Sequence, residues 1–249
     1  MPSSRRTTPK VAATNSLAEQ VRGVVAWLER RGSQRVRDGM ARFAIPADRA
    51  FGIPVGDLRK YAKSLGRNHE LAAALWDTGW YEARLLAAFL AEPARVTPAE
   101  MDRWCRDFDN WATCDTACFH LFDRTPHAWR MIKAWSKRKD EFEKRAAFAL
   151  LASIALHDKQ AADEPFADCL PLIERAATDE RNFVKKGVVW ALRGVGGRSP
   201  ALHAAAISLA QQLATSDDPT SRWVGSTTLR ELRSPAASKR LSKQKRLRA

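Results

Sequence analysis

Hydrophobic positions along the chain recur at intervals of three and four residues. In residues 17–31, LAEQVRGVVAWLERR, the apolar stripe consists of Leu17, Val21, Val24, Val25 and Leu28, and charged residues occupy the opposite side. This is the period of an amphipathic helix. The same spacing returns in ARLLAAFLA, KRAAFALLASIAL, KKGVVWALRGV and ALHAAAISLAQQLA, whereas alternating β-branched stretches between hairpin turns are nearly absent. The pattern predicts an all-α protein.

Four of these segments also resemble one another, because each begins with a basic residue followed by small and apolar residues. The basic residues lie 61 residues apart from Arg84 to Arg145, then 41 to Lys186 and 36 to Arg222, and the first interval leaves room for one more unit. Intervals of about 40 residues are typical of paired-helix repeats. We therefore predict a short, curved, right-handed α-solenoid of HEAT-like helical-pair repeats, whose inner helices line one concave face.

The composition supports a folded repeat domain flanked by tails. The chain has 249 residues, of which 45% are hydrophobic, with nine Trp and ten Phe, so general disorder is excluded. We assign residues 17–234 to the repeat domain and residues 1–16 and 235–249 to flexible basic tails. The C-terminal tail is either an additional electrostatic contact to DNA or a solvated end. The chain lacks an apolar stretch of membrane-spanning length and an N-terminal secretory core, so we expect an intracellular protein without membrane association.

Charge narrows the class of partner. Lys and Arg total 42 against 28 acidic residues, a net charge of +14, which favours a polyanion such as DNA or RNA. A cation near a helix start has the wrong sign for the helix dipole, so its repetition suggests a use outside the helix. The candidate phosphate contacts are Arg145, Lys185, Lys186 and Arg222. The alternative is ion pairing between repeats, through Glu141, Glu143 or Glu180.

The cysteines do not form a recognisable site. Cys105, Cys114, Cys118 and Cys169 have no paired CxxC spacing, so we expect reduced, packed thiols. A metal site at Cys114 and Cys118 with the nearby His120 lacks the spacing of tetrahedral sites. The sequence therefore predicts neither a metal nor a cofactor.

The segment FDNWATCDTACFHLF contains an unusual carboxylate. Trp111 and Asp115 are four residues apart, so a helix would place them on one face, and Asp109 or Asn110 would cap its start. Trp190 lies on the corresponding part of a later helix. Core packing explains each indole alone, but two indoles and a carboxylate beside candidate phosphate contacts predict a cleft with chemistry.

A carboxylate near DNA phosphates is repulsive unless positive charge develops beside it. Cleavage of an N-glycosidic bond produces an oxocarbenium-like sugar, which Asp115 would stabilise while it orients water. The indoles of Trp111 and Trp190 would attract both this sugar and a cationic alkylated base. An N3- or N7-alkylpurine leaves without a general acid, and we expect none of the five histidines to pair with an acid.

The sequence resembles the bacterial DNA alkylation repair glycosylases of the AlkD type. The motifs that carry the resemblance are MARF, FGIPVGDLRK, NWATCDT, EKRAAFALL, FVKKGVVWALR and SRWVGSTTLREL, between Met40 and Leu232. The resemblance implies a HEAT-like solenoid that holds duplex DNA in its concave face, without a deep base-flipping pocket and without a cofactor. It implies catalytic roles for Trp111, Asp115 and Trp190, and a DNA-backbone contact for Arg145.

Two further motif residues are candidate DNA contacts, namely Arg193 and Phe43. The family can carry a tyrosine in place of Phe43, so the hydroxyl is missing here. The resemblance also implies a monomer that acts on duplex DNA with alkylated bases in the bacterial cytoplasm. Two alternatives are a non-catalytic HEAT-like protein that binds damaged or branched DNA, and a scaffold for an acidic protein.

Overall fold

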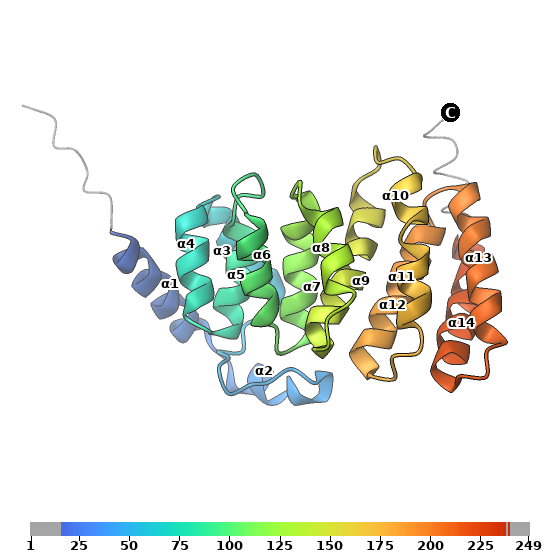
Figure 1. Cartoon of the computed structure of the whole chain (residues 1–249). Coiled ribbons are helices and arrows are strands. Elements are labelled where there is room, and N and C mark those ends of the chain that lie inside the picture. The colour runs from blue at the N-terminus through green and yellow to red at the C-terminus, as the bar shows by residue number, and fades with distance from the viewer. Residues whose placement is uncertain (1–15, 238, 240–249) are drawn as a thin grey trace, which may run out of the picture.

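The structure of the protein is a computed structural model that describes residues 16–237 and residue 239 (Figure 1). The two tails predicted from the sequence lie almost entirely outside the described residues. Helices follow one another along the described chain. They are α1 (Leu17–Arg31), α2 (Gln34–Asp38), η1 (Ala41–Phe43), α3 (Val55–Leu65), α4 (His69–Asp77), α5 (Tyr81–Leu90), α6 (Pro98–Arg106), α7 (Trp111–His120), η2 (Phe122–Arg124), α8 (Ala128–Trp135), α9 (Glu141–His157), α10 (Glu164–Ala167), α11 (Leu170–Ala176), α12 (Asn182–Gly196), α13 (Pro200–Ala214) and α14 (Pro219–Leu232).

The helices form a linear array of packed pairs. Helix α4 packs on α5, α8 on α9, α11 on α12 and α13 on α14. The second members of these pairs, together with α3 and α7, also pack on one another along the array. Their order is α3, α5, α7, α9, α12 and α14, and we call them the inner row. Figure 1 shows the array running from blue to red along its length. The all-α class and the helical solenoid predicted from the sequence are therefore confirmed.

Helix starts are fixed by polar side chains that accept backbone N–H groups. At α7 the side chain of Asn110 accepts from the N–H of Thr113 at 2.9 Å, so Asn110 is the cap and Asp109 is not. Such a cap satisfies one of the donors that a helix start leaves without a partner. The cap sets the register of α7, with Trp111 as its first residue and Asp115 as its fifth.

Apolar side chains between the rows form one core. Trp76 and Trp104 stack with ring centroids 4.0 Å apart, and both are fully buried. On α1, Leu28 is buried, whereas Leu17, on the same apolar stripe, is 42% exposed. Figure 1 shows the reason, since α1 ends the array and its first turn points away from α4.

Helices α13 and α14 approach each other most closely at Gly225. A Cβ atom there would lie 2.4 Å from the backbone nitrogen of Ala214 and 2.5 Å from the carbonyl oxygen of Ala210. Since backbone cannot rotate aside, we expect Gly225→Ala to lower the free energy of unfolding by about 3 kcal/mol. Urea unfolding followed by circular dichroism measures this. Gly23→Ala is the control, because nothing lies within 4 Å of its Cβ and it should be neutral or slightly stabilising. Equal stability of both variants would contradict the close approach.

The residues between α1 and α3, which we call the α2 segment (residues 32–54), lie outside the helix pairs. Figure 1 shows α2 running across the lower end of the array. Glu82, fully buried in the first turn of α5, accepts the backbone N–H groups of Phe51, Gly52 and Ile53 at 2.9, 2.7 and 3.1 Å. Gly52 has φ +82°, a conformation that favours glycine. These contacts hold the segment against the inner row.

Candidate active site

Helix α7 presents a stripe of three side chains. Trp111, Asp115 and Phe119 are the first, fifth and ninth residues of the helix, so they lie one turn apart on one face. All three are partly exposed. Phe119 stacks against Trp190 of α12, with centroids 6.4 Å apart and ring planes at 25°. Trp111 and Asp115 therefore share one face of α7, and Trp190 packs against that face through its stack on Phe119. The sequence analysis did not include Phe119, although its four-residue spacing from Asp115 was visible.

Asp115 is held by an arginine from the next helix of the inner row. The Nε of Arg145 donates to Oδ1 of Asp115 at 2.9 Å, and Nη2 donates to Oδ2 at 2.7 Å. The Arg145 side chain is 8% exposed and the Asp115 side chain 18%. Two parallel bonds of this kind fix the plane of the carboxylate as well as its position. One edge of a carboxylate with a defined orientation therefore remains available to a ligand.

A third bond from Arg145 reaches a further repeat. Its Nη1 donates to the carbonyl oxygen of Phe183, in the first turn of α12, at 2.7 Å. A guanidinium carries five N–H groups, and three are used in these contacts. A contact between Arg145 and the DNA backbone stays a prediction, and it would use the remaining donors. In this structure the first role of Arg145 is to orient Asp115.

Burial and pairing act in opposite directions on the two charges. Burial raises the pKa of the Asp115 carboxyl above its ordinary value, while the Arg145 guanidinium opposes the rise. Burial also disfavours the charged form of Arg145, but Asp115 outweighs it and raises the pKa of Arg145. A carboxylate of raised pKa is a stronger proton acceptor than an exposed one. Such a group suits the orientation of water.

Trp111 also contacts the α2 segment. Its Nε1 donates to the carbonyl oxygen of Phe43 at 2.8 Å. The Phe43 ring is 54% exposed, and the guanidinium carbon of Arg42 lies 4.9 Å from its centroid. The predicted DNA contact at Phe43 therefore lies beside the start of the α7 stripe, on a segment held in place by Glu82.

The other predicted DNA contacts differ in what surrounds them. Lys186 is the fifth residue of α12, as Arg145 is of α9, and it is exposed. Lys185 lies over the Trp223 ring, with Nζ 5.2 Å from the centroid. Arg222 donates to the carbonyl oxygens of residues 216 and 217, both at 2.7 Å, and Arg193 pairs with Glu231. A phosphate contact requires an exposed cation, so Lys186 remains the strongest candidate in this series.

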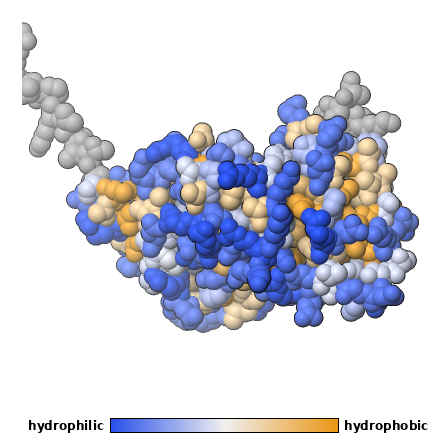
Figure 2. All heavy atoms as spheres, viewed as in Figure 1, coloured by the Kyte–Doolittle hydropathy of each residue, from blue (hydrophilic) through white to orange (hydrophobic). Residues whose placement is uncertain are grey.

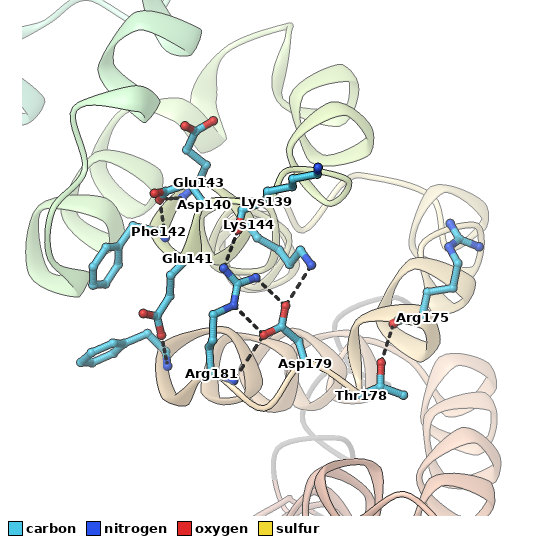
Figure 3. A network of polar contacts seen from close by, with 11 residues as sticks. Lys139, Asp140, Glu141, Phe142, Glu143, Lys144, Arg175, Thr178, Asp179 and Arg181 are labelled. Carbon is cyan, nitrogen blue, oxygen red and sulfur yellow. Dashed lines mark hydrogen bonds and ion pairs between the residues drawn. The ribbon is translucent and has the colours of Figure 1, made fainter.

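A polar network joins the starts of α9 and α12 (Figure 3). The carboxylate of Asp179 accepts from Nζ of Lys144 at 2.9 Å and from Nε and Nη2 of Arg181 at 2.8 and 2.6 Å. The Arg181 hydrogen bonds hold the pKa of Asp179 well below its usual range. Glu141 accepts the backbone N–H of Phe183 at 3.0 Å. Cations do pair across repeats: Arg145 pairs with Asp115, Arg193 with Glu231, and Lys144 with Asp179, which lies in the loop before α12. Of the acids predicted as partners, Glu143 pairs with Arg138.

Two histidines pair with acids, so the expectation that none does was wrong. His157 Nδ1 bonds Oδ2 of Asp123, and His69 Nε2 lies 3.3 Å from Oε2 of Glu100. Each pair joins residues from different helices, at a separation that sequence spacing does not reveal. The Asp123 side chain is fully buried, and burial raises its pKa. His157 lies 4.2 Å from Phe119 between ring centroids, beside the α7 stripe.

All four cysteines are buried and free. Within residues 16–237 and residue 239, no group of three or more His, Cys, Asp or Glu side chains is arranged to hold a metal ion. Over the same residues, none of the helices combines the length and the apolar character of a membrane span.

The fold and the site together define a helical-repeat protein with an ion pair and two indoles at the middle of its inner row. The family model described as DNA alkylation repair enzyme matches residues 24–231, so the chain belongs to that family. The chain is also similar to a solved structure described as a member of a new family of proteins related to the HEAT-like repeat DNA glycosylases with affinity for branched DNA structures. The TM-score is 0.69 at 20% sequence identity, over 84% of this chain and 94% of that chain. A comparison with curated proteins found no match.

Proposed function

We propose that the protein is a monofunctional DNA-alkylpurine N-glycosylase that hydrolyses the glycosidic bond of cationic N3- and N7-alkylpurines in duplex DNA. The observation that carries this proposal is the Asp115 carboxylate, which Arg145 holds in one orientation. Asp115 lies on the same face of α7 as Trp111 and Phe119, and Phe119 stacks against Trp190. Membership of the DNA alkylation repair enzyme family supports it. The protein would act as a monomer in the bacterial cytoplasm, without a cofactor.

In the proposed reaction the bond between C1′ and the base nitrogen breaks, and its electron pair neutralises the cationic base. Asp115 stabilises the positive charge that develops on the sugar, and Trp111 and Trp190 attract both cations through their ring faces. Water then adds to C1′ and gives its proton to Asp115 or to solvent. Arg145 fixes the carboxylate in the orientation that this sequence of steps requires.

The test is release of free base from duplex DNA that carries 7-methylguanine or 3-methyladenine, measured by chromatography of the supernatant. We expect release of both bases by the wild-type protein and none from the unmodified duplex. An inactive but folded and DNA-binding protein would overturn the proposal.

The second candidate function is binding of branched DNA without base release. It is favoured by the solved structure described above, whose protein is described as having affinity for branched DNA structures. It is also compatible with the positive charge of the chain. Binding that depends steeply on salt, without any base release, would favour this candidate.

Lys186 is predicted to contact a DNA phosphate. We expect Lys186→Gln to weaken binding of any duplex sequence and to reduce the slope of log K against log salt by about 1, because one fewer counterion is released. Fluorescence anisotropy at several salt concentrations measures the slope. Lys133→Gln is the control, since Lys133 is exposed on α8, outside the inner row. If both variants changed the slope equally, the prediction that DNA follows the inner row would be wrong.

A further inference from the structure

A pocket lined by cationic side chains lies at the opposite end of α7 from Trp111. It has a volume of about 430 Å³ and is formed where α3, α5 and α7 end. Its lining residues, which define what we call the His120 pocket, are Arg59, Ala62, Lys63, Gly66, Arg67, Phe89 and His120. Trp111 and His120 are the first and last residues of α7, so they are separated by about 14 Å along the helix axis. Trp111, Asp115 and Trp190 are not among its lining residues, although His120 directly follows Phe119 of the α7 stripe in the chain.

Positive charge accumulates in the His120 pocket without an acid in its lining. Arg59, Lys63 and Arg67 contribute the cations. Burial and then the charges of Arg59, Arg124, His157 and Arg67 together lower the pKa of His120 to about 4. Burial and then Arg124 lower the pKa of Arg67, against a weaker effect of Glu92. Several positive charges in one pocket attract an anion from solution.

Helix dipoles explain part of this accumulation, because cations are favoured at helix C-termini. They do not explain the aromatic walls. Phe89 and His120 meet edge to face with centroids 5.0 Å apart, and the guanidinium carbon of Arg59 lies 5.7 Å from the Phe89 centroid. Arg59 Nη2 is 2.7 Å from His120 Nε2, so the neutral imidazole accepts this bond. Rings and cations together suit a ligand that has both a flat base and a phosphate.

The rings also continue toward the Asp115 site. Phe119 lies 5.2 Å from His120 between centroids and 6.4 Å from Trp190. A line of aromatic side chains thus runs from Phe89 on α5, across α7, to Trp190 on α12. Successive bases of a single strand stack on such lines, whatever their sequence.

We propose that the His120 pocket binds an unpaired nucleotide of a single-stranded DNA arm, with its base against Phe89 and His120 and its phosphate on Lys63 and Arg67. The pocket is open to solvent, and its volume is in the range of sites that hold one small ligand. This inference goes beyond the proposed base release and does not require it. It concerns which DNA structures the protein holds.

The test compares two DNA ligands of the full chain by fluorescence anisotropy at fixed salt. One is a blunt duplex, and the other is the same duplex with a short single-stranded thymidine arm. We expect the wild-type protein to prefer the armed duplex by at least about 5-fold, the low end of measured base–aromatic stacking. Lys63→Gln/Arg67→Gln should remove this preference while the blunt duplex binds within about 2-fold of wild type, because nonspecific binding depends on the remaining cations.

Phe89→Leu is the second variant, which keeps every cation and removes only the ring. It should also reduce the preference, whereas Arg130→Gln/Lys133→Gln on α8 removes the same charge and should not. Competition by thymidine monophosphate but not by inorganic phosphate would support a nucleotide site. Equal competition by inorganic phosphate, equal weakening of both duplexes, or no preference in the wild type would overturn the proposal. Base release from the blunt methylated duplex, measured in parallel, separates failure of this inference from failure of the Asp115 assignment.

Discussion

Asp115→Asn is expected to reduce base release from methylated duplex DNA by about 100-fold to 1000-fold, the effect of removing one preorganised electrostatic group from an active site. DNA binding should stay intact or become tighter, because a negative charge next to the phosphates is lost. The two quantities are measured by chromatography of released 7-methylguanine and by fluorescence anisotropy with the same duplex. Release at the wild-type rate would remove Asp115 from the mechanism.

The control for this variant must separate chemistry from folding. Asparagine can still accept one hydrogen bond from Arg145, but the buried guanidinium loses its counter-charge. Urea unfolding of the variant therefore accompanies each rate, and rates are compared only where the protein is folded. Asp109→Asn removes an exposed carboxylate just before α7 and makes the same change in net charge. It should leave base release within about 3-fold of wild type, since its carboxylate has no role in the proposed reaction.

Arg145→Gln is expected to lower the free energy of unfolding. It removes the partner of a carboxylate that is only 18% exposed, and it also removes the bond to the Phe183 carbonyl. Breaking a buried ion pair from one side costs about 3–5 kcal/mol, and the residual exposure of Asp115 favours the lower end, about 3 kcal/mol. Urea unfolding at neutral pH measures the loss.

The same variant should shift the pH dependence of base release. Burial raises the pKa of Asp115, and Arg145 opposes that rise. Without the guanidinium the pKa rises further, so the carboxylate form is lost at a higher pH and the acid limb of the rate profile moves to higher pH. Arg145→Lys retains the charge but not the two parallel bonds, and its profile should lie closer to wild type. An unchanged profile in the folded Gln variant would show that Arg145 has only a structural role.

A double-mutant cycle resolves the ion pair itself. In Asp115→Asn/Arg145→Gln both charges are absent, so neither is left buried without a partner. The double variant should be more stable than the sum of the two single losses predicts, by about 1–3 kcal/mol of coupling. Additive losses would mean that the two side chains act independently, which the bidentate geometry contradicts.

Local features of the site could be predicted from the sequence, because helix geometry alone determines them. The four-residue spacing placed Trp111 and Asp115 on one face, and Asn110 was one of two residues expected to cap that helix. The repeated segments also predicted the paired-helix array. Within α7 the relevant atoms lie within about two helical turns, where the 3.6-residue period is sufficient. The array needed only the intervals of about 40 residues between the repeated segments.

Contacts between repeats could not be predicted in the same way. Asp115 and Arg145 are 30 residues apart, and Asp123 and His157 are 34 residues apart. Which side chains meet depends on how neighbouring helices are rotated and shifted, and one turn of shift along α7 would have placed Trp111 or Phe119 opposite Arg145 instead of Asp115. Leu17 shows the same limit, since it lies on the apolar stripe of α1 and is nevertheless 42% exposed.

The three bonds of Arg145 connect α7, α9 and α12, so the residue that orients the proposed catalytic carboxylate also connects the repeats at the centre of the array. In a linear array each repeat depends mainly on its neighbours, and the two ends are less constrained than the middle. A substitution of only one of Asp115 and Arg145 would leave the other charge without its partner, so a homologue with that single change would be less stable. Loss of the proposed activity during evolution would therefore favour replacement of both residues together, and we expect the two positions to vary together among homologues.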